Sequence, residues 1–324
     1  MTMLGPKSRK STVETLEEVA ADQDRLTETP QSQWRLAWRR FRGRKSGMIG
    51  LGIVTALVLM AILAPLLAPF PPNQVLIGKE ENVGPRDPPC VHAFGCSEEL
   101  PQHVLGTDAN VRDELSRIIY GARVSLTLGF FVVSIALLVG SSLGALAGYI
   151  GGGFDNIVMR IMDVILGFPS LLLAIAIVSV LGPGLRNALL AISIVAIPAY
   201  ARVMRAQVLS IKESDYVAAS RALGAKPHQI LIRRVVPNAI TPLVVLATLG
   251  VATAILEAAG LSFLGLGAQP PAAEWGSMLA SERNQVFTSP QLVFFPGLAI
   301  MITVLGFNLM GDGLRDALDP TLNK

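Results

Sequence analysis

Charged residues are scarce in this 324-residue chain. Asp, Glu, Lys and Arg make up 16% of it, whereas a soluble domain carries about 25%. The chain also has only two cysteines, which excludes a disulfide-rich scaffold. Its net charge of +3 comes without a basic cluster interleaved with aromatic residues, so nucleic acid is not expected as a partner. Hydrophobic residues account for 51% of the chain, which indicates a membrane protein and excludes a disordered one.

The apolar residues are gathered into six intervals without any Asp, Glu, Lys or Arg, from 15 to 33 residues in length. A helix needs about 20 mostly apolar residues to cross the hydrocarbon of a bilayer. Five intervals are long enough alone, and the fourth is long enough if its helix continues toward Leu209. One such run can be a buried core helix, but six together predict an all-α polytopic membrane protein. The six transmembrane helices are expected at 48–70, 122–149, 157–181, 187–208, 239–262 and 291–311.

Lys and Arg are distributed unevenly among the loops. Residues 31–47 carry six basic residues and 202–238 carry seven, whereas 71–120 carries four basic residues against eight acids. Cytoplasmic loops are enriched in Lys and Arg. We therefore expect both termini in the cytoplasm and residues 71–120 outside.

Two segments precede or begin the first span. Residues 1–33 are polar with little apolar periodicity, so we expect a disordered cytoplasmic tail. In the segment 34–70, Trp34, Trp38 and Phe41 recur at helical spacing, with Arg and Lys on the other faces. This pattern predicts an interfacial helix ahead of the first transmembrane helix. The alternative is that these residues are simply the cytoplasmic end of that span.

Residues 71–120 form the expected extracytoplasmic loop. Its first half is rich in proline. Its second half has the pattern of a helix on the outer membrane surface, with Thr107 or Asp108 as the N-cap. The apolar stripe of this helix consists of Val111, Leu115, Ile118 and Ile119.

The two cysteines, Cys90 and Cys96, lie in this outer loop. An oxidising compartment lets a disulfide persist there, and free thiols are the next alternative. His92 and His103 are nearby, but their spacing matches no zinc pattern, so a metal site is the least supported of the three states. No other metal site is expected.

The cytoplasmic segment 208–238 is too polar to span a membrane and too regular for a linker. Ser214 or Asp215 is suited to cap a first helix, and Gly224 is placed to end it in the left-handed conformation. Pro227 suits the start of a second helix. The first helix has a flat face of small residues, Ala218, Ala219 and Ala222. Such a helix pair is suited to docking into a cleft on another protein.

Two carboxylates lie in or beside the spans, where ionisable groups cost about 2.5–3.5 kcal/mol on insertion scales. For Asp163 we expect an ion pair with Arg202 or Arg205 on the next helix. Glu257 ends the fifth uncharged interval. It either faces the translocation pathway or a partner subunit, or it lies at the outer membrane interface.

Prolines interrupt two of the expected spans. Pro169 and Pro198 fall inside the third and fourth, where they free carbonyl groups and kink helices. Each is interpreted either as a hinge or as a static kink.

The cytoplasmic segment resembles the coupling motif of the permeases of ABC importers, which reads Glu-Ala-Ala, then Gly, then Ile-x-Leu-Pro. Ala218-Ala219-Ser220 stand at the first three positions, and Gly224 and Pro237 follow at the family's spacing. Pro237 is also expected to close the second helix. The motif is half kept, because Ala218 replaces its Glu, and Arg234 and Val236 replace its Ile and Leu.

The longer match is to the dipeptide/oligopeptide/nickel branch of this family, over about residues 34–320, and specifically to the C-type partner of a two-permease pair. One departure is Val111, where the family usually has Gly. Outside the coupling segment, the resemblance is carried by Leu105–Asp108, Arg112–Asp113, Ser116–Arg117, Gly121–Leu126, Glu257–Gly267, Trp275–Gly276 and Gly311–Pro320. The residues expected to couple to an ATPase are Asp215, Tyr216, Ala218, Ala219, Arg221, Ala222, Leu223, Gly224, Ala225, Pro237 and Asn238.

The resemblance implies a type I ABC-importer permease fold, with the permease domain at 121–320, in a bacterial or archaeal plasma membrane. It implies a second homologous permease, two cytosolic ABC ATPases and an extracytoplasmic substrate-binding protein as partners, besides the lipid bilayer. The implied cargo is di- or oligopeptides; the alternatives are nickel chelates, glutathione or another small solute. The chain has no Gly-x4-Gly-Lys-Ser/Thr loop, so ATP and Mg are expected on partner subunits, with no cofactor and no catalytic residue on this chain.

Two other classes of membrane protein compete with this interpretation. An intramembrane enzyme needs catalytic Asp pairs or a His-Glu cluster within the spans, and the isolated Asp163 and Glu257 argue against it. A secondary transporter commonly shows internal repeats, and none is found across the six intervals.

Overall fold

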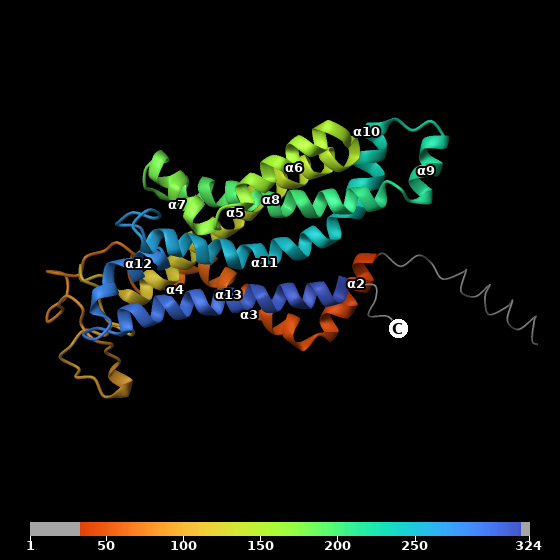
Figure 1. The fold of residues 1–324 in the computed structure, drawn as a ribbon. Helices are drawn as coiled ribbons and strands as arrows, with labels where there is room; N and C mark the ends of the chain where they lie inside the picture. Colours follow the sequence, from red (N-terminus) through yellow and green to blue (C-terminus); the bar gives the residue numbers. More distant parts are fainter. Residues whose placement is uncertain (1–32, 319–324) are drawn as a thin grey trace, which may run out of the picture.

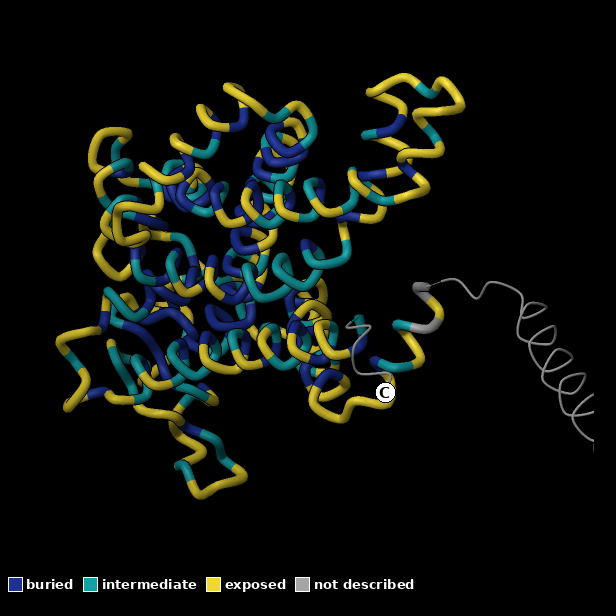
Figure 2. The backbone as a smooth tube through the Cα atoms, turned by 45° about the vertical axis from the view of Figure 1, so that its right-hand side comes forward, coloured by how far each residue is buried: buried dark blue, intermediate teal, exposed yellow. Residues whose placement is uncertain are grey.

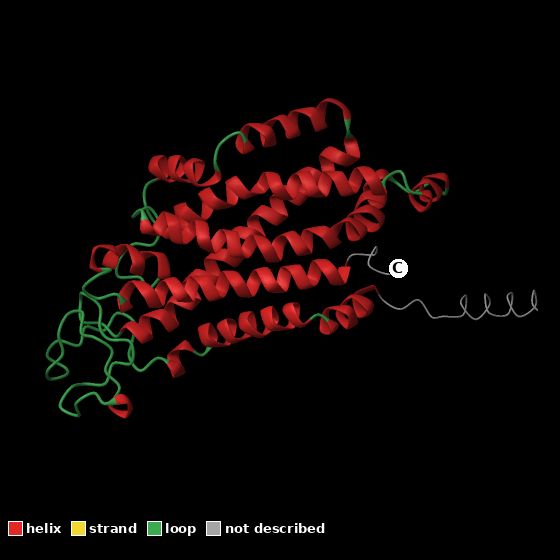
Figure 3. Cartoon of the chain, turned by 60° about the horizontal axis from the view of Figure 1, so that its bottom comes forward, coloured by secondary structure: helices red, strands yellow, loops and turns green. Residues whose placement is uncertain are grey.

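The computed structural model describes residues 33–318 of the chain. The expected disordered tail, residues 1–33, therefore lies outside the described residues except for Gln33. Within the described range the regular structure is helical and contains no β-strand (Figure 3). The long helices run side by side in one bundle (Figure 1). They are α3 (Lys45–Ile62), α5 (Glu114–Ile150), α8 (Leu185–Ile211), α11 (Val236–Phe263) and α13 (Gln291–Leu318).

Shorter helices lie at the two ends of the bundle and along one side of it (Figure 1). The α-helices are α2 (Gln33–Gly43), α4 (Ala64–Leu67), α6 (Gly152–Leu166), α7 (Ser170–Leu181), α9 (Asp215–Ala222), α10 (Pro227–Ile230) and α12 (Trp275–Glu282). Two 3₁₀ turns, η1 (His92–Phe94) and η3 (Arg283–Gln285), and a π-helical turn, η2 (Leu231–Val235), complete the described chain.

The prediction of six membrane spans is confirmed, with one of them broken. Five helical segments of the described chain are long and apolar enough to cross a membrane, and α6 with α7, bent by 92°, makes the sixth when the pair is counted as one span. The expectation of one continuous helix at 157–181 is therefore wrong. The chain leaves the helix at Gly167-Phe168-Pro169, because glycine is a poor helix former and proline both lacks an N–H and disfavours helix at the residue before it. Pro198, in contrast, is buried inside the continuous helix α8.

The bundle is held together by small residues where two helices meet. Gly140, Gly144 and Gly148 of α5 are buried at four-residue spacing and face the backbone of α8. A Cβ atom at Gly140 would lie 2.6 Å from the carbonyl oxygen of Ile197, and one at Gly144 would collide with the backbone of Ala201. In a bilayer, where burial from lipid gains little, such close backbone approach is a main source of helix association.

The N-terminal interfacial helix is a separate element, α2, because Arg44 adopts an extended conformation between α2 and α3. It is therefore not simply the end of the first span. Phe41 of α2 is buried against Gly47 and Gly313, which fastens α2 to the end of α13. Trp38 is half-exposed and stacks on Phe41 at 5.8 Å, and the side chain of Trp34 lies outside the described residues.

Candidate functional sites

The α9–α10 pair projects from the end of the bundle opposite the long outer loop (Figure 1). Its surface is mostly exposed (Figure 2), and Val217 is the one buried residue of α9. Val217 packs onto the main core, so it anchors the helix while the other faces stay open. Leu223, directly after α9, is 88% exposed and adds apolar area to this surface. The open surface of α9 consists of Asp215, Tyr216, Ala218, Ala219, Arg221, Ala222 and Leu223.

Helix α9 begins and ends at the residues that the sequence predicts. Ser214 is the N-cap residue, although its hydroxyl donates to the Ile211 carbonyl and does not accept from the helix. Gly224 has a φ of +82°, the left-handed conformation that the sequence predicts. The Gly224 N–H donates to the Arg221 carbonyl and the Ala225 N–H to the Ser220 carbonyl, the hydrogen bonds of a Schellman motif.

The expectation that Pro237 closes the second helix is wrong. The chain stays helical from α10 through the π turn η2 into α11, and Pro237 lies in the first turn of α11. Proline lacks a backbone N–H, which costs little in the first turn of a helix. The π turn η2 directly before α11 is wider than an α-helical turn and accommodates the ring of Pro237. The side-chain amide of Asn238 donates to the Arg234 carbonyl at 2.6 Å across this junction. The segment 208–238 is thus joined to a membrane span without a flexible break.

Glu257 lies within α11, six residues before the helix ends at Phe263. It is half-buried and lines a partly open cavity of about 320 Å³ between α5, α7, α8 and α11. The other polar side chains around this cavity are those of Ser170, Tyr200 and Thr253. Glu257 thus borders a space between helices, while its depth in the membrane stays a prediction.

Two ion pairs tie the broken span to α8. Asp163 pairs with Arg202 at 2.5 Å, the first of the two partners considered, and both side chains are about half-exposed. Arg205 instead pairs with Asp155 through two hydrogen bonds of 2.5 and 2.6 Å. The second pair was missed from the sequence, although Asp155 at the start of α6 is the acid that bounds an uncharged interval.

The outer loop is ordered by a disulfide and by buried polar groups. Cys90 and Cys96 are joined in a disulfide, so neither is a free thiol or a metal ligand. His103 is buried between Asp113, at 2.9 Å, and Glu80, at 3.0 Å. Burial lowers the pKa of His103, but the hydrogen bonds and charges of Asp113 and Glu80 together outweigh it and raise the pKa above its usual value. Among residues 33–318, no cluster of His, Cys, Asp and Glu is suited to hold a metal ion.

The expected surface helix at the end of this loop is not a separate element. Helix α5 begins at Glu114 and continues unbroken into the span. Asp113 is its cap and accepts from the Ser116 N–H at 2.7 Å, which excludes Thr107 and Asp108 from that role. Asp108 instead accepts from the Arg112 backbone N–H and guanidinium, at 2.9 and 2.7 Å. Several acceptors near one helix start compete, and the contacts of Asp108 with arginine decide the outcome.

A tryptophan fastens α12 to the start of α5. Trp275 is fully buried, and its indole N–H donates to the Ile118 carbonyl at 3.0 Å. A Cβ at Gly121 would lie 2.8 Å from the indole ring, so glycine is required there. Glu274 caps α12 by accepting from two backbone N–H groups, and burial raises the pKa of this carboxyl although those hydrogen bonds oppose it.

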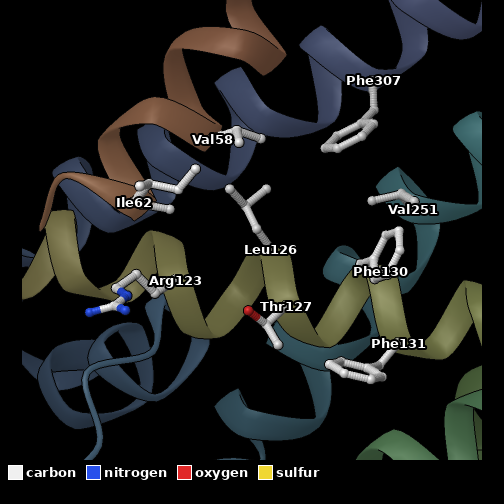
Figure 4. A pocket seen from close by; sticks show the side chains of 10 residues that line it. Val58, Ile62, Arg123, Leu126, Thr127, Phe130, Phe131, Val251 and Phe307 are labelled. Atoms are coloured by element: carbon white, nitrogen blue, oxygen red, sulfur yellow. The ribbon is translucent and has the colours of Figure 1, made fainter.

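A second, larger depression of about 510 Å³ lies between α3, α5, α11 and α13 (Figure 4). Val58, Ile62, Phe130 and Phe131 are among its mostly apolar lining residues, and Arg123 lies at one end of it. Such a wall suits lipid or another apolar helix better than a polar solute.

Comparison with known proteins identifies the class of this fold. Residues 140–324 match the model of the binding-protein-dependent transport system inner membrane component, and residues 32–89 match the N-terminal TM domain of oligopeptide transport permease C. The inward-facing MetNI methionine ABC transporter has the same fold, with a TM-score of 0.52 and 21% identity over 63% of this chain and 96% of the solved one. The described chain therefore has the permease fold of an ABC importer.

Relatives of known name are much more similar in sequence. The dipeptide transport system permease protein DppC of Alkalihalophilus pseudofirmus is 47% identical over 91% of this chain and 92% of its own length. The di/tripeptide transport system permease protein DppC of Pseudomonas aeruginosa is 46% identical over 88% and 91%. The glutathione transport system permease protein GsiD of Pectobacterium atrosepticum is 41% identical over 92% and 94%. The chain belongs to the family of binding-protein-dependent inner-membrane permeases, within its dipeptide permease C-like branch.

Proposed function

We propose that this chain is the C-type permease subunit of an ATP-driven importer of dipeptides and short oligopeptides. It forms half of a translocation pathway with a second, homologous permease. The observation that carries the cargo assignment is the 46–47% identity, over nearly the whole chain, to two permeases named for dipeptides and di/tripeptides. Glutathione is the second candidate, supported by the relative that is 41% identical.

ATP and Mg are bound and hydrolysed by two separate cytosolic ATPases, and this chain supplies no catalytic residue and no cofactor. The support is the absence of a phosphate-binding glycine-lysine loop from the sequence. The α9–α10 pair docks in a groove on one ATPase. Its small exposed side chains at Ala218, Ala219 and Ala222 let the ATPase surface approach α9 closely, and the exposed Leu223 supplies apolar area for burial.

The unbroken helix from α10 into α11 gives a route for coupling. A displacement of α9 on its partner is carried through η2 to the span that holds Glu257. Single-turn π bulges are frequent at functional sites in helices. In the proposed orientation, α2, α9 and the end of α13 face the cytoplasm, and the outer loop receives an extracytoplasmic substrate-binding protein.

The test is import into proteoliposomes that contain both permeases, both ATPases and the binding protein. With ATP inside, radiolabelled dialanine is expected to accumulate, and omission of this chain is expected to abolish the accumulation. Glutathione in place of dialanine tests the second candidate. Accumulation of glutathione without dialanine would replace the peptide assignment, and accumulation of neither would reject both.

A further inference from the structure

The cavity beside Glu257 has an asymmetric lining. Leu246, Gly250, Thr253 and Glu257 repeat at spacings of three and four along α11, so one face of that helix forms its wall. Apolar side chains of α5 and α8 form most of the remainder. Glu257 is the one carboxylate among the lining residues, and no basic residue lines the cavity with it.

This carboxylate has no ionic partner within the described chain. The two acids of the broken span are both paired, Asp155 with Arg205 and Asp163 with Arg202. Glu257 of α11, in contrast, forms no ion pair with a Lys, Arg or His of residues 33–318. Ser170 at the start of α7 lines the same cavity and offers a hydroxyl group to it. Charged residues inside a membrane protein are almost always paired or face a water-filled pathway. Glu257 is therefore available to a cation other than those of the described residues.

The size and lining of the cavity indicate which kind of cation it can hold. Its volume of about 320 Å³ lies at the lower end of the range of small-molecule pockets. One carboxylate with a few hydroxyls is too few ligands for a specific metal site. An ammonium group needs only one carboxylate and neighbouring oxygens for a charge-assisted hydrogen bond. Apolar walls beside that carboxylate tolerate alkyl groups of different shapes.

We propose that Glu257 binds the α-ammonium group of a peptide in transit through this cavity. The proposal rests on the proposed function and narrows it, because cargo must then carry a free amine. Peptides and glutathione do so, whereas an anionic metal chelate without an amine does not. The hydroxyls of Ser170, Tyr200 and Thr253 offer further hydrogen bonds to the same end of the cargo.

The test measures binding to the assembled transporter in lipid nanodiscs, without binding protein. Saturation-transfer NMR is recorded with dialanine and with N-acetyl-dialanine, which differ in the ammonium group. The wild type is expected to give at least a ten-fold stronger signal with dialanine. Glu257→Gln is expected to remove that preference, and Glu257→Asp to keep part of it. Asp163→Asn, which neutralises an acid outside the cavity, is expected to keep all of it.

Equal signals from the two peptides in the wild type would overturn the proposal, as would an unchanged preference in Glu257→Gln. Failure of Glu257→Gln to assemble with its partners would assign the residue a structural role and would also overturn it. A separate measurement, the import of dialanine by the complete wild-type system, tests the proposed function independently of the ammonium site. If dialanine is imported without a preference at Glu257, only the ammonium site fails. If the wild type imports no dialanine, the peptide assignment fails.

Discussion

Gly144 shows how a single hydrogen atom in place of a side chain sets the packing of this bundle. It lies where α5 meets the backbone of Ala201 on α8, with Gly140 and Gly148 one turn to either side. The three glycines recur every fourth residue, the small-xxx-small pattern of closely packed membrane helices. Val111 is a contrasting residue, because it has a φ of +54° and is fully buried. A positive φ of this kind is strained for a β-branched side chain.

Gly144→Ala is expected to lower the thermal unfolding midpoint of the purified protein, because overpacking at a tight contact costs about 1–3 kcal/mol. Gly52→Ala is the matched control, since a Cβ at Gly52 of α3 meets nothing within 4 Å. That control is expected to leave the midpoint unchanged or slightly higher, as Ala is favoured over Gly in helices. Equal midpoints for the two variants would show that α5 and α8 do not pack as described.

His103 gives the outer loop a pH-dependent stability. Its pKa is raised in the folded protein, so protonation stabilises the fold. This contribution is complete below the unfolded pKa of about 6.5 and is lost as pH rises through the higher folded value. His103→Gln is therefore expected to lower the unfolding midpoint at pH 5.5 more than at pH 9. A difference between variant and wild type that grows with pH would contradict the buried His103–Asp113 pair.

At the scale of elements, α9 is a short helix whose position depends on its two ends. Val217 anchors it to the core, and the Gly224 turn directs the chain into α10. No heavy atom lies within 4 Å of a Cβ built at Gly224, so a substitution there acts through the backbone and not through a clash.

Gly224→Val is expected to uncouple ATP hydrolysis from transport, because a β-branched residue in the left-handed conformation costs about 1–2 kcal/mol and redirects α10. Gly224→Asn is expected to keep coupling, since Asn tolerates that conformation. The measurement is binding-protein-stimulated ATPase activity together with import in proteoliposomes. Unchanged stimulation in both variants would mean that this segment is not the coupling element.

At the scale of the whole molecule, the described chain has two chemically different ends. The outer loop, with its disulfide and its buried His103 and Arg117, lies at one end (Figure 1). Helices α2 and α9 and the end of α13 lie at the other (Figure 1). Among the described residues, the segments 35–45 and 202–234 carry six and seven Lys and Arg, a basic enrichment typical of cytoplasmic loops.

Single cysteines at Ser97 and Ser214 are expected to react with a membrane-impermeant maleimide from opposite faces of the membrane. Cys90 and Cys96 are replaced by serine in this background, so that the introduced thiol is the one that reacts. Intact cells are expected to label at position 97, and inverted vesicles at position 214. Labelling of both positions from the same face would overturn the six-span topology.

The sequence by itself determined the features that depend on local chemistry. The lengths of the uncharged intervals give the spans, because a helix must satisfy its own backbone within the bilayer. The left-handed Gly224 is equally local, because only the residue at that position decides whether the backbone can turn there. The family also follows from the sequence, since its motifs are short and lie at fixed positions along the chain.

Tertiary structure decided the features that depend on competition between alternatives. Asp113 rather than Asp108 caps α5, because the folded chain begins this helix at Glu114 while Asp108 contacts Arg112 and the buried Arg117. Asp163 takes Arg202 because Asp155 occupies Arg205, a choice that needs both helices in place. The 92° break at Pro169 is allowed by the sequence, but its angle comes from the packing of α7 against α8 and α11. The cavity at Glu257 exists only where four helices meet, and no pattern along one helix determines the space between it and three others.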